Sequence, residues 1–114
     1  MEDKTKEILI WIAALSILGV LLIILSHSKT QIPEEVAKCI GKNSILYTQL
    51  GCRHCEDQEA MFGNNLKYLN MTDCFYEVET CQKEGIEATP TWIIKGEKYK
   101  GVQEIKKIRE LTGC

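Results

Sequence analysis

The sequence has little excess charge, and this shortage excludes one large class of function. Its 114 residues carry 14 Lys and Arg against 16 Asp and Glu, and both signs are scattered along the chain. A protein that binds nucleic acid needs a basic stripe to neutralise phosphates, and this sequence has none. It also lacks an internal repeat, and its length leaves room for one small domain. We therefore expect a single domain and no nucleic-acid partner.

Cysteine, in contrast, is abundant, with six residues in so short a chain. Thiol pools keep cytosolic cysteines reduced, and a cytosolic protein seldom has so many outside metal or redox sites. The count therefore favours an oxidising compartment.

An uncharged apolar block runs from Ile8 to Leu25. As an α-helix it would be ~27 Å long at ~1.5 Å per residue, close to the ~30 Å hydrocarbon core of a bilayer. A cleaved signal peptide is the alternative, because Ser26-His27-Ser28 loosely resembles a cleavage site. The block is longer than the ~7 to 15 apolar residues of such signals, and the preferred alanines are missing.

We therefore predict an uncleaved transmembrane anchor that contacts membrane lipid. Lysines stand on both sides of it, so they do not fix its orientation, and the cysteine content favours a single-pass protein with its domain outside the cytoplasm. The expected divisions are an N-terminal tail over 1–7, the anchor over 8–25, a linker over 26–32 and the domain over 33–114.

The order of structural patterns after the anchor predicts an α/β domain. Helical patterns are expected from Pro33 to Gly41, over 55–69, over 81–84 and in the segment containing Val102, Ile105, Ile108 and Leu111. Strands are expected over 44–50 and 72–79, and as a hairpin of 91–95 and 97–100 around Gly96. This order gives a mixed sheet with helices on both faces, which is the architecture of the thioredoxin-like fold.

Two cysteines three positions apart, Cys52 and Cys55, stand where the first strand gives way to a helix. The thiolate is the reactive form of cysteine, and unpaired N–H groups at a helix N-terminus stabilise an anion. Arg53 and His54 between the two cysteines can each add positive charge. We therefore predict that Cys52 is the attacking thiolate, that Cys55 resolves the mixed disulfide, and that Arg53 and His54 tune the site.

From about Val36 onward the chain resembles the thioredoxin-like domain associated with vitamin K epoxide reductase homologues. The matching segments are Ala37-Lys38-Cys39, the run from Cys52 to Gln58, Met61-Phe62-Gly63, Gly85-Ile86, Pro90-Thr91-Trp92 and Tyr99-Lys100-Gly101-Val102. The resemblance implies a cis peptide bond before Pro90 and a backbone at Thr89 that pairs with an incoming peptide. One departure is Arg53, which stands where that family commonly has proline, so the resemblance does not fix the redox potential.

The same resemblance implies a function. The domain would pass disulfides to cysteine-containing secreted proteins and be reoxidised by a separate membrane quinone reductase of the vitamin K epoxide reductase type. No cofactor other than the redox-active disulfide is expected. The alternatives are a reductase or isomerase that uses the same site in the other direction, and a glutaredoxin-like enzyme that would need a glutathione pocket.

Four cysteines remain, and they can be joined in three ways. Cys74 and Cys81 bracket a connection after the second strand, and the related domains carry cysteines in this region, so we favour their pairing as a structural disulfide. Cys39 and Cys114 would then bridge, stay free or link two molecules. A zinc-stabilised binding module using Cys52, Cys55, Cys74 and Cys81 is the remaining alternative, although the spacing of the second pair is unlike a usual zinc knuckle and we predict no metal.

Overall fold

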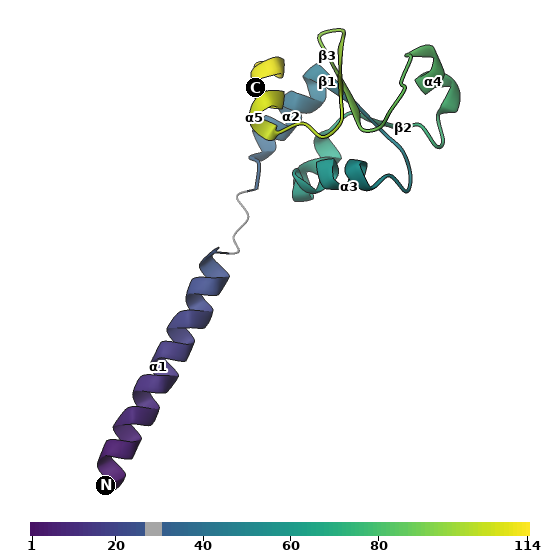
Figure 1. Cartoon of the computed structure of the whole chain (residues 1–114). Coiled ribbons are helices and arrows are strands. Elements are labelled where there is room, and N and C mark those ends of the chain that lie inside the picture. Colours follow the sequence, from purple (N-terminus) through teal and green to yellow (C-terminus); the bar gives the residue numbers. More distant parts are fainter. Residues whose placement is uncertain (27–30) are drawn as a thin grey trace. The chain divides into compact units, whose positions relative to one another are not determined.

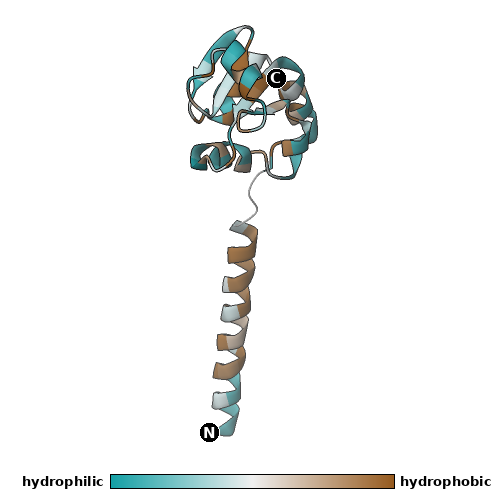
Figure 2. Cartoon of the chain, turned by 90° about the vertical axis from the view of Figure 1, so that its right-hand side faces the viewer, coloured by the Kyte–Doolittle hydropathy of each residue, from teal (hydrophilic) through white to brown (hydrophobic). Residues whose placement is uncertain are grey.

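The computed structural model describes residues 1–26 and 31–114, which form two units (Figure 1). The first unit contains α1 (Glu2–Ser26), a helix of 25 residues with no buried side chain. In the part of the chain that is described, it is the one helix long and apolar enough to cross a membrane, and Figure 2 shows hydrophobic residues along most of its length. The helix begins before the apolar block, since Glu2 and Asp3 face the positive end of the helix dipole. Most of the predicted linker, residues 27–30, lies outside the described residues.

The second unit is built on a four-stranded mixed sheet in the order β2-β1-β3-β4. β1 (Ser44–Thr48) pairs parallel with β2 (Met71–Asp73) and antiparallel with β3 (Thr91–Ile94), and β4 (Glu97–Lys100) completes the predicted hairpin. The turn of that hairpin, Lys95-Gly96, has positive φ at both residues, as a tight two-residue connection requires. The parallel strands β1 and β2 need a crossover connection, which the helical segments between them in the chain provide.

Five helical elements surround this sheet, and four of them pack on one of its faces. They are α2 (Glu34–Asn43), α3 (Arg53–Ala60), the 3₁₀ helix η1 (Gly63–Tyr68), α4 (Val78–Lys83) and α5 (Ile105–Thr112). On one face, Leu46 of β1 and Trp92 of β3 are paired in register and join the main core, in which Trp92 and Phe62 are fully buried with ring centroids 5.9 Å apart. Tyr47 projects to the other face, where Glu84 and Glu77 at the two ends of α4 are its charged neighbours. The predicted α/β fold class is therefore confirmed.

Helix boundaries differ from the sequence expectation, most clearly at two glycines. Gly41 does not end the first helix of the domain, because α2 continues to Asn43. A Cβ at Gly41 would collide with the carbonyl oxygen of Tyr68, so glycine is needed there for close packing of η1 on α2. The helix expected over 55–69 is divided, because Gly63 takes a φ of 53° and the chain continues as η1.

The strand expected over 72–79 is also shorter than predicted. β2 ends at Asp73, whose Oδ1 accepts a hydrogen bond from the backbone N–H of Phe75 at 2.8 Å and from that of Leu50 at 3.2 Å. These bonds turn the chain out of the sheet, and α4 begins at Val78. A local bond from side chain to backbone thus overrides the strand propensity of the residues that follow.

Candidate redox site

Cys52 lies at the N-cap of α3, directly after the turn that ends β1. Its backbone N–H donates to the Gln49 carbonyl at 3.1 Å, and Gly51 takes a φ of 80° to close this turn. The Cys52 sulfur accepts a hydrogen bond from the backbone N–H of Cys55 at 3.2 Å, and the two cysteines form a disulfide with a Cα–Cα distance of 5.2 Å. The sulfur therefore occupies the position at which a helix N-terminus stabilises negative charge.

The two sulfur-bearing residues differ in their access to solvent. Cys52 is half-buried, whereas the exposed fraction of Cys55 is 2%. An incoming thiolate can therefore reach Cys52 and not Cys55. In an exchange reaction at this disulfide, Cys52 would thus be the sulfur that is attacked and Cys55 the sulfur that leaves.

The loop before β3 approaches the exposed side of this disulfide. The Thr89–Pro90 peptide bond is cis, and Pro90 is fully buried. The carbonyl oxygen of Thr89 lies 3.5 Å from the Cys52 sulfur, and the Thr89 hydroxyl donates to that sulfur at 3.6 Å. The structure thus brings together Cys52 and Thr89, which are 37 positions apart in the chain.

Contacts with β4 and the segment after it hold this loop in position. The backbone N–H of Gly101 donates to the Pro90 carbonyl at 2.8 Å, and the Lys100 ammonium forms an ion pair with Glu87. This ammonium holds the pKa of the Glu87 carboxyl below its usual value, first by hydrogen bonding and then by charge. The carboxylate is exposed, so the pair orients the loop more than it stabilises the fold.

Gln58 is a buried polar residue of the site to which the sequence analysis assigned no role. It lies one turn after Cys55 in α3 and is fully buried. Its Oε1 accepts from the Trp92 indole N–H at 3.0 Å and from the Gln103 N–H at 2.7 Å, while its Nε2 donates to the Gln103 carbonyl at 3.1 Å. These bonds fix α3 to β3 and to the segment after β4, so the amide helps set the position of the cysteines relative to Thr89. The signal in the sequence is a glutamine three residues after the second cysteine of the motif.

Arg53 and His54 both lie on the solvent side of α3. Arg53 is exposed, and the side chain of His54 is 77% exposed. The Nδ1 atom of His54 lies 3.8 Å from a carboxylate oxygen of Asp57, an exposed pair that contributes little to stability. Both residues remain next to the disulfide in the chain, where positive charge would act on an approaching thiolate.

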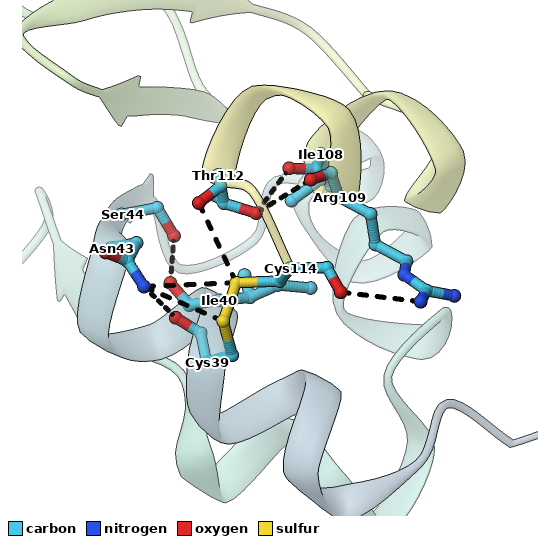
Figure 3. Close-up of a disulfide and its surroundings, with 8 residues drawn as sticks. All are labelled: Cys39, Ile40, Asn43, Ser44, Ile108, Arg109, Thr112 and Cys114. Atoms are coloured by element: carbon cyan, nitrogen blue, oxygen red, sulfur yellow. Dashed lines mark hydrogen bonds between the residues drawn. A yellow bond between two sulfur atoms is a disulfide. The ribbon is translucent and has the colours of Figure 1, made fainter.

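The other four cysteines form two more disulfides. Cys74 pairs with Cys81 across seven positions, and Cys39 pairs with Cys114 across 75. Figure 3 shows the second bridge joining α2 to the end of the chain, with the Asn43 amide donating to the Cys39 carbonyl at 2.8 Å. Over residues 1–26 and 31–114, no three His, Cys, Asp or Glu side chains gather as a metal site would require.

The sheet order, the Cys-x-x-Cys disulfide at the start of α3 and the cis-proline loop facing its first cysteine define a thioredoxin-like domain. No family model matches the chain. Over 98 residues the chain is 33% identical to the thiol-disulfide oxidoreductase LTO1 of Arabidopsis thaliana, and this match covers 75% of the chain. The chain spans only 26% of the length of that curated relative.

One similar solved structure is the NTD_N/C domain of the alkylhydroperoxide reductase AhpF from Enterococcus faecalis. It has a TM-score of 0.48 and 20% sequence identity, and the match covers 72% of this chain and 45% of that one.

Proposed function

We propose that the chain is a thiol-disulfide oxidoreductase whose reactive group is the Cys52–Cys55 disulfide. One observation carries the proposal: an accessible sulfur at the N-cap of α3 accepts a backbone N–H bond and faces the Thr89 carbonyl, while its partner sulfur is buried. The sequence similarity to a thiol-disulfide oxidoreductase is a second observation that supports the proposal.

In the proposed reaction a substrate thiolate attacks the Cys52 sulfur. A substrate–Cys52 disulfide forms, the Cys52–Cys55 bond breaks, and Cys55 leaves as a thiolate. A second substrate thiolate then attacks the substrate sulfur of the mixed disulfide, and Cys52 leaves as a thiolate. Two electrons pass from the substrate dithiol to this chain, and the two protons lost by the substrate thiols go to solvent or to the released thiolates.

We further propose that α1 anchors the domain to a membrane with the redox site outside the cytoplasm. The helix length and the three disulfides among the described residues support this topology. The partners would be cysteine-containing secreted proteins and a membrane quinone reductase of the vitamin K epoxide reductase type, which would accept the two electrons. The partner rests on the resemblance described above. The proposal includes no cofactor other than the redox-active disulfide.

Trapping tests the reaction. In Cys55→Ala the Cys52 thiolate can still attack the disulfide of an oxidised substrate, and one substrate sulfur leaves as a thiolate. No second thiol of this chain is present to resolve the mixed disulfide, so Cys52 should accumulate covalently bound substrate, which non-reducing gels and mass spectrometry identify. In Cys52→Ala no adduct should form at Cys55, because that residue is buried. In the reduced wild-type protein, iodoacetamide at neutral pH should alkylate Cys52 faster than it alkylates glutathione. A Cys52 no more reactive than glutathione, with no adduct in Cys55→Ala, would refute the proposal.

The reduction potential of the Cys52–Cys55 disulfide distinguishes the two directions of electron flow. A reduction potential of about −120 mV favours disulfide donation to secreted proteins, and one of about −270 mV favours a reductase.

An isomerase would rearrange a scrambled substrate without net oxidation. A glutaredoxin-like enzyme would be reduced by glutathione through a mixed disulfide, and a zinc-stabilised module would retain metal after reduction and show no exchange. Reoxidation of the dithiol by the quinone reductase in mixed liposomes tests the partner.

A further inference from the structure

Four exposed apolar side chains of the domain lie in the loops after β1 and β2 and at the start of α4. Among the described residues of the domain, six large hydrophobic side chains are exposed: Leu50, Met61, Phe75, Tyr76, Val78 and Val102. Leu50 stands two positions after the end of β1, and Phe75 stands two positions after the end of β2. Because β1 and β2 are parallel, both loops leave the sheet at the edge where α3 and its cysteines begin.

Specific contacts tie these two loops to each other. Oδ1 of Asp73 accepts from the N–H groups of both Leu50 and Phe75, and the N–H of Cys74 donates to the Thr48 carbonyl at 2.8 Å. The rings of Phe75 and Tyr76 pack edge to face with centroids 5.0 Å apart. The Cys74–Cys81 disulfide then closes the loop onto α4. The apolar side chains therefore stand on a braced segment, and their exposure does not result from a loose end.

Residues next to Leu50 and Phe75 in the chain face the loop that contacts the redox site. A notch of about 70 Å³ between the loops is lined by Gln49 and Cys74 on one side and by residues 86–89 on the other. Thr89, which lines the notch, also contacts the Cys52 sulfur. A peptide joined to Cys52 could thus extend past Thr89 toward Phe75 and Tyr76.

The same region carries negative charge without paired cations. Six carboxylates lie on α3, at the end of β2 and on α4 or its two caps: Glu56, Glu59, Asp73, Glu77, Glu79 and Glu84. None of them belongs to the three ion pairs found in the described chain. Burial, reinforced by the charges of Glu56 and Asp73, raises the pKa of the Glu59 carboxyl. Glu56 and Asp73 therefore lie close enough to Glu59 to repel its charge, and a cationic ligand would relieve that repulsion.

We propose that the surface formed by Leu50, Phe75, Tyr76 and Val78, with its surrounding carboxylates, binds the substrate, and that the preferred substrate is a cysteine-bearing protein segment with apolar and basic residues next to its cysteine. This proposal rests on the proposed function and adds a substrate class to it. The apolar neighbour would pack on Phe75 and Tyr76, since exposed aromatic side chains are effective contact residues. The basic neighbour would interact with Glu77 and Glu79, and this attraction raises mainly the association rate.

Four peptides test the proposal with the full chain in neutral detergent micelles. Each peptide carries two cysteines that can form a disulfide, and their neighbours are Leu and Lys, Leu and Glu, Ser and Lys, or Ser and Glu. The rate of reduction of the Cys52–Cys55 disulfide is followed by acid quenching, alkylation and peptide mapping. Dithiothreitol, which needs no docking surface, reports the intrinsic reactivity of the same disulfide. We expect the Leu/Lys peptide to react at least about tenfold faster than the Ser/Glu peptide at low salt, with the charge-dependent part lost at high salt.

Paired variants assign the two preferences to residues. Phe75→Ser with Tyr76→Ser should remove the preference for Leu, whereas Tyr76→Phe, which keeps the ring, should retain it. Glu77→Gln with Glu79→Gln should remove the preference for Lys. Glu97→Gln with Glu110→Gln, on β4 and α5, is the matched control and should change neither preference. Dithiothreitol needs no docking surface, so its rate should stay within about twofold of the wild-type rate, because the substitutions leave Cys52, Cys55 and Thr89 unchanged.

The outcomes separate the two proposals. Equal rates for the four peptides in the wild-type protein, with normal reduction by dithiothreitol, would overturn the docking surface and leave the proposed function standing. A preference for the Glu peptides would overturn it as well. A disulfide that neither dithiothreitol nor any peptide reduces would overturn the proposed function itself. The charge variants and the peptide comparison in the wild-type protein decide the question even where the Phe75 variant fails to fold.

Discussion

Removal of the Cys39–Cys114 disulfide should destabilise the protein more than removal of the other structural bridge. In the chain-entropy model a cross-link stabilises by limiting the unfolded chain, and its effect increases with the logarithm of the loop length. The Cys39–Cys114 bridge has a sequence separation of 75, which corresponds to about 4.5 kcal/mol, and the Cys74–Cys81 bridge has a separation of seven, which corresponds to about 2.5 kcal/mol. The expected difference is therefore about 2 kcal/mol.

The contacts of the folded state are consistent with this expectation when both cysteines of the bridge are replaced by serine. Cys39 and Cys114 are both half-buried, so Cys39→Ser with Cys114→Ser places hydroxyls where water can reach them. The core contacts of Ile40 in α2 and Ile108 in α5 remain after the bridge is lost. The loss of stability should thus come mainly from the greater freedom of the unfolded chain.

Urea unfolding measures this difference. The buried Trp92 provides the fluorescence signal, and Trp11→Phe in every variant removes the other tryptophan. The midpoint of Cys39→Ser with Cys114→Ser should lie about 1–2 M urea below that of Cys74→Ser with Cys81→Ser, for slopes typical of small domains. Equal midpoints, or a lower one for the Cys74 and Cys81 variant, would show that native contacts outweigh loop entropy here, and the reasoning would be refuted.

Three further changes test other parts of the fold. Gln58→Leu leaves the Trp92 N–H and two backbone groups without a partner, so it should lower the free energy of unfolding by about 2–3 kcal/mol and shift the reduction potential. Gln58→Glu can still accept two of these bonds and should restore part of the loss, whereas an unchanged reduction potential in both variants would contradict a positioning role. Burial and the charges of Glu56 and Asp73 raise the pKa of Glu59 in the folded state, so the fold loses stability as the pH rises through the window between its unfolded and folded values. Glu59→Gln should therefore raise the urea midpoint at neutral pH and leave it unchanged in acid. Gly41→Ala should lower the thermal midpoint by about 5 °C or more because its Cβ collides with the Tyr68 carbonyl, and an unchanged midpoint would show that η1 can move away.

Local patterns in the sequence were sufficient for the order of elements and for the position of the Cys-x-x-Cys motif. The apolar block after Glu7, the strand formers before Gly51 and the tight turn at Gly96 each act within a few residues, so the sequence predicts them directly. The end of β2 at Asp73 was not predictable in this way. Besides the local bond from the N–H of Phe75, it depends on the N–H of Leu50, which belongs to another loop that reaches Asp73 only when β1 and β2 pair.

The sequence by itself thus determined an apolar helix, a mixed α/β domain and a thiol pair at a strand-to-helix junction. Only the tertiary structure decided which cysteines pair at long range and what Gln58 binds. Cys39 and Cys114 are joined because packing of α2 against α5 and the left-handed Gly113 bring their Cα atoms to 5.9 Å. The sequence favoured the pairing of Cys74 with Cys81 and left Cys39 and Cys114 open, and distance in the folded molecule is the quantity that decides whether these two bridge.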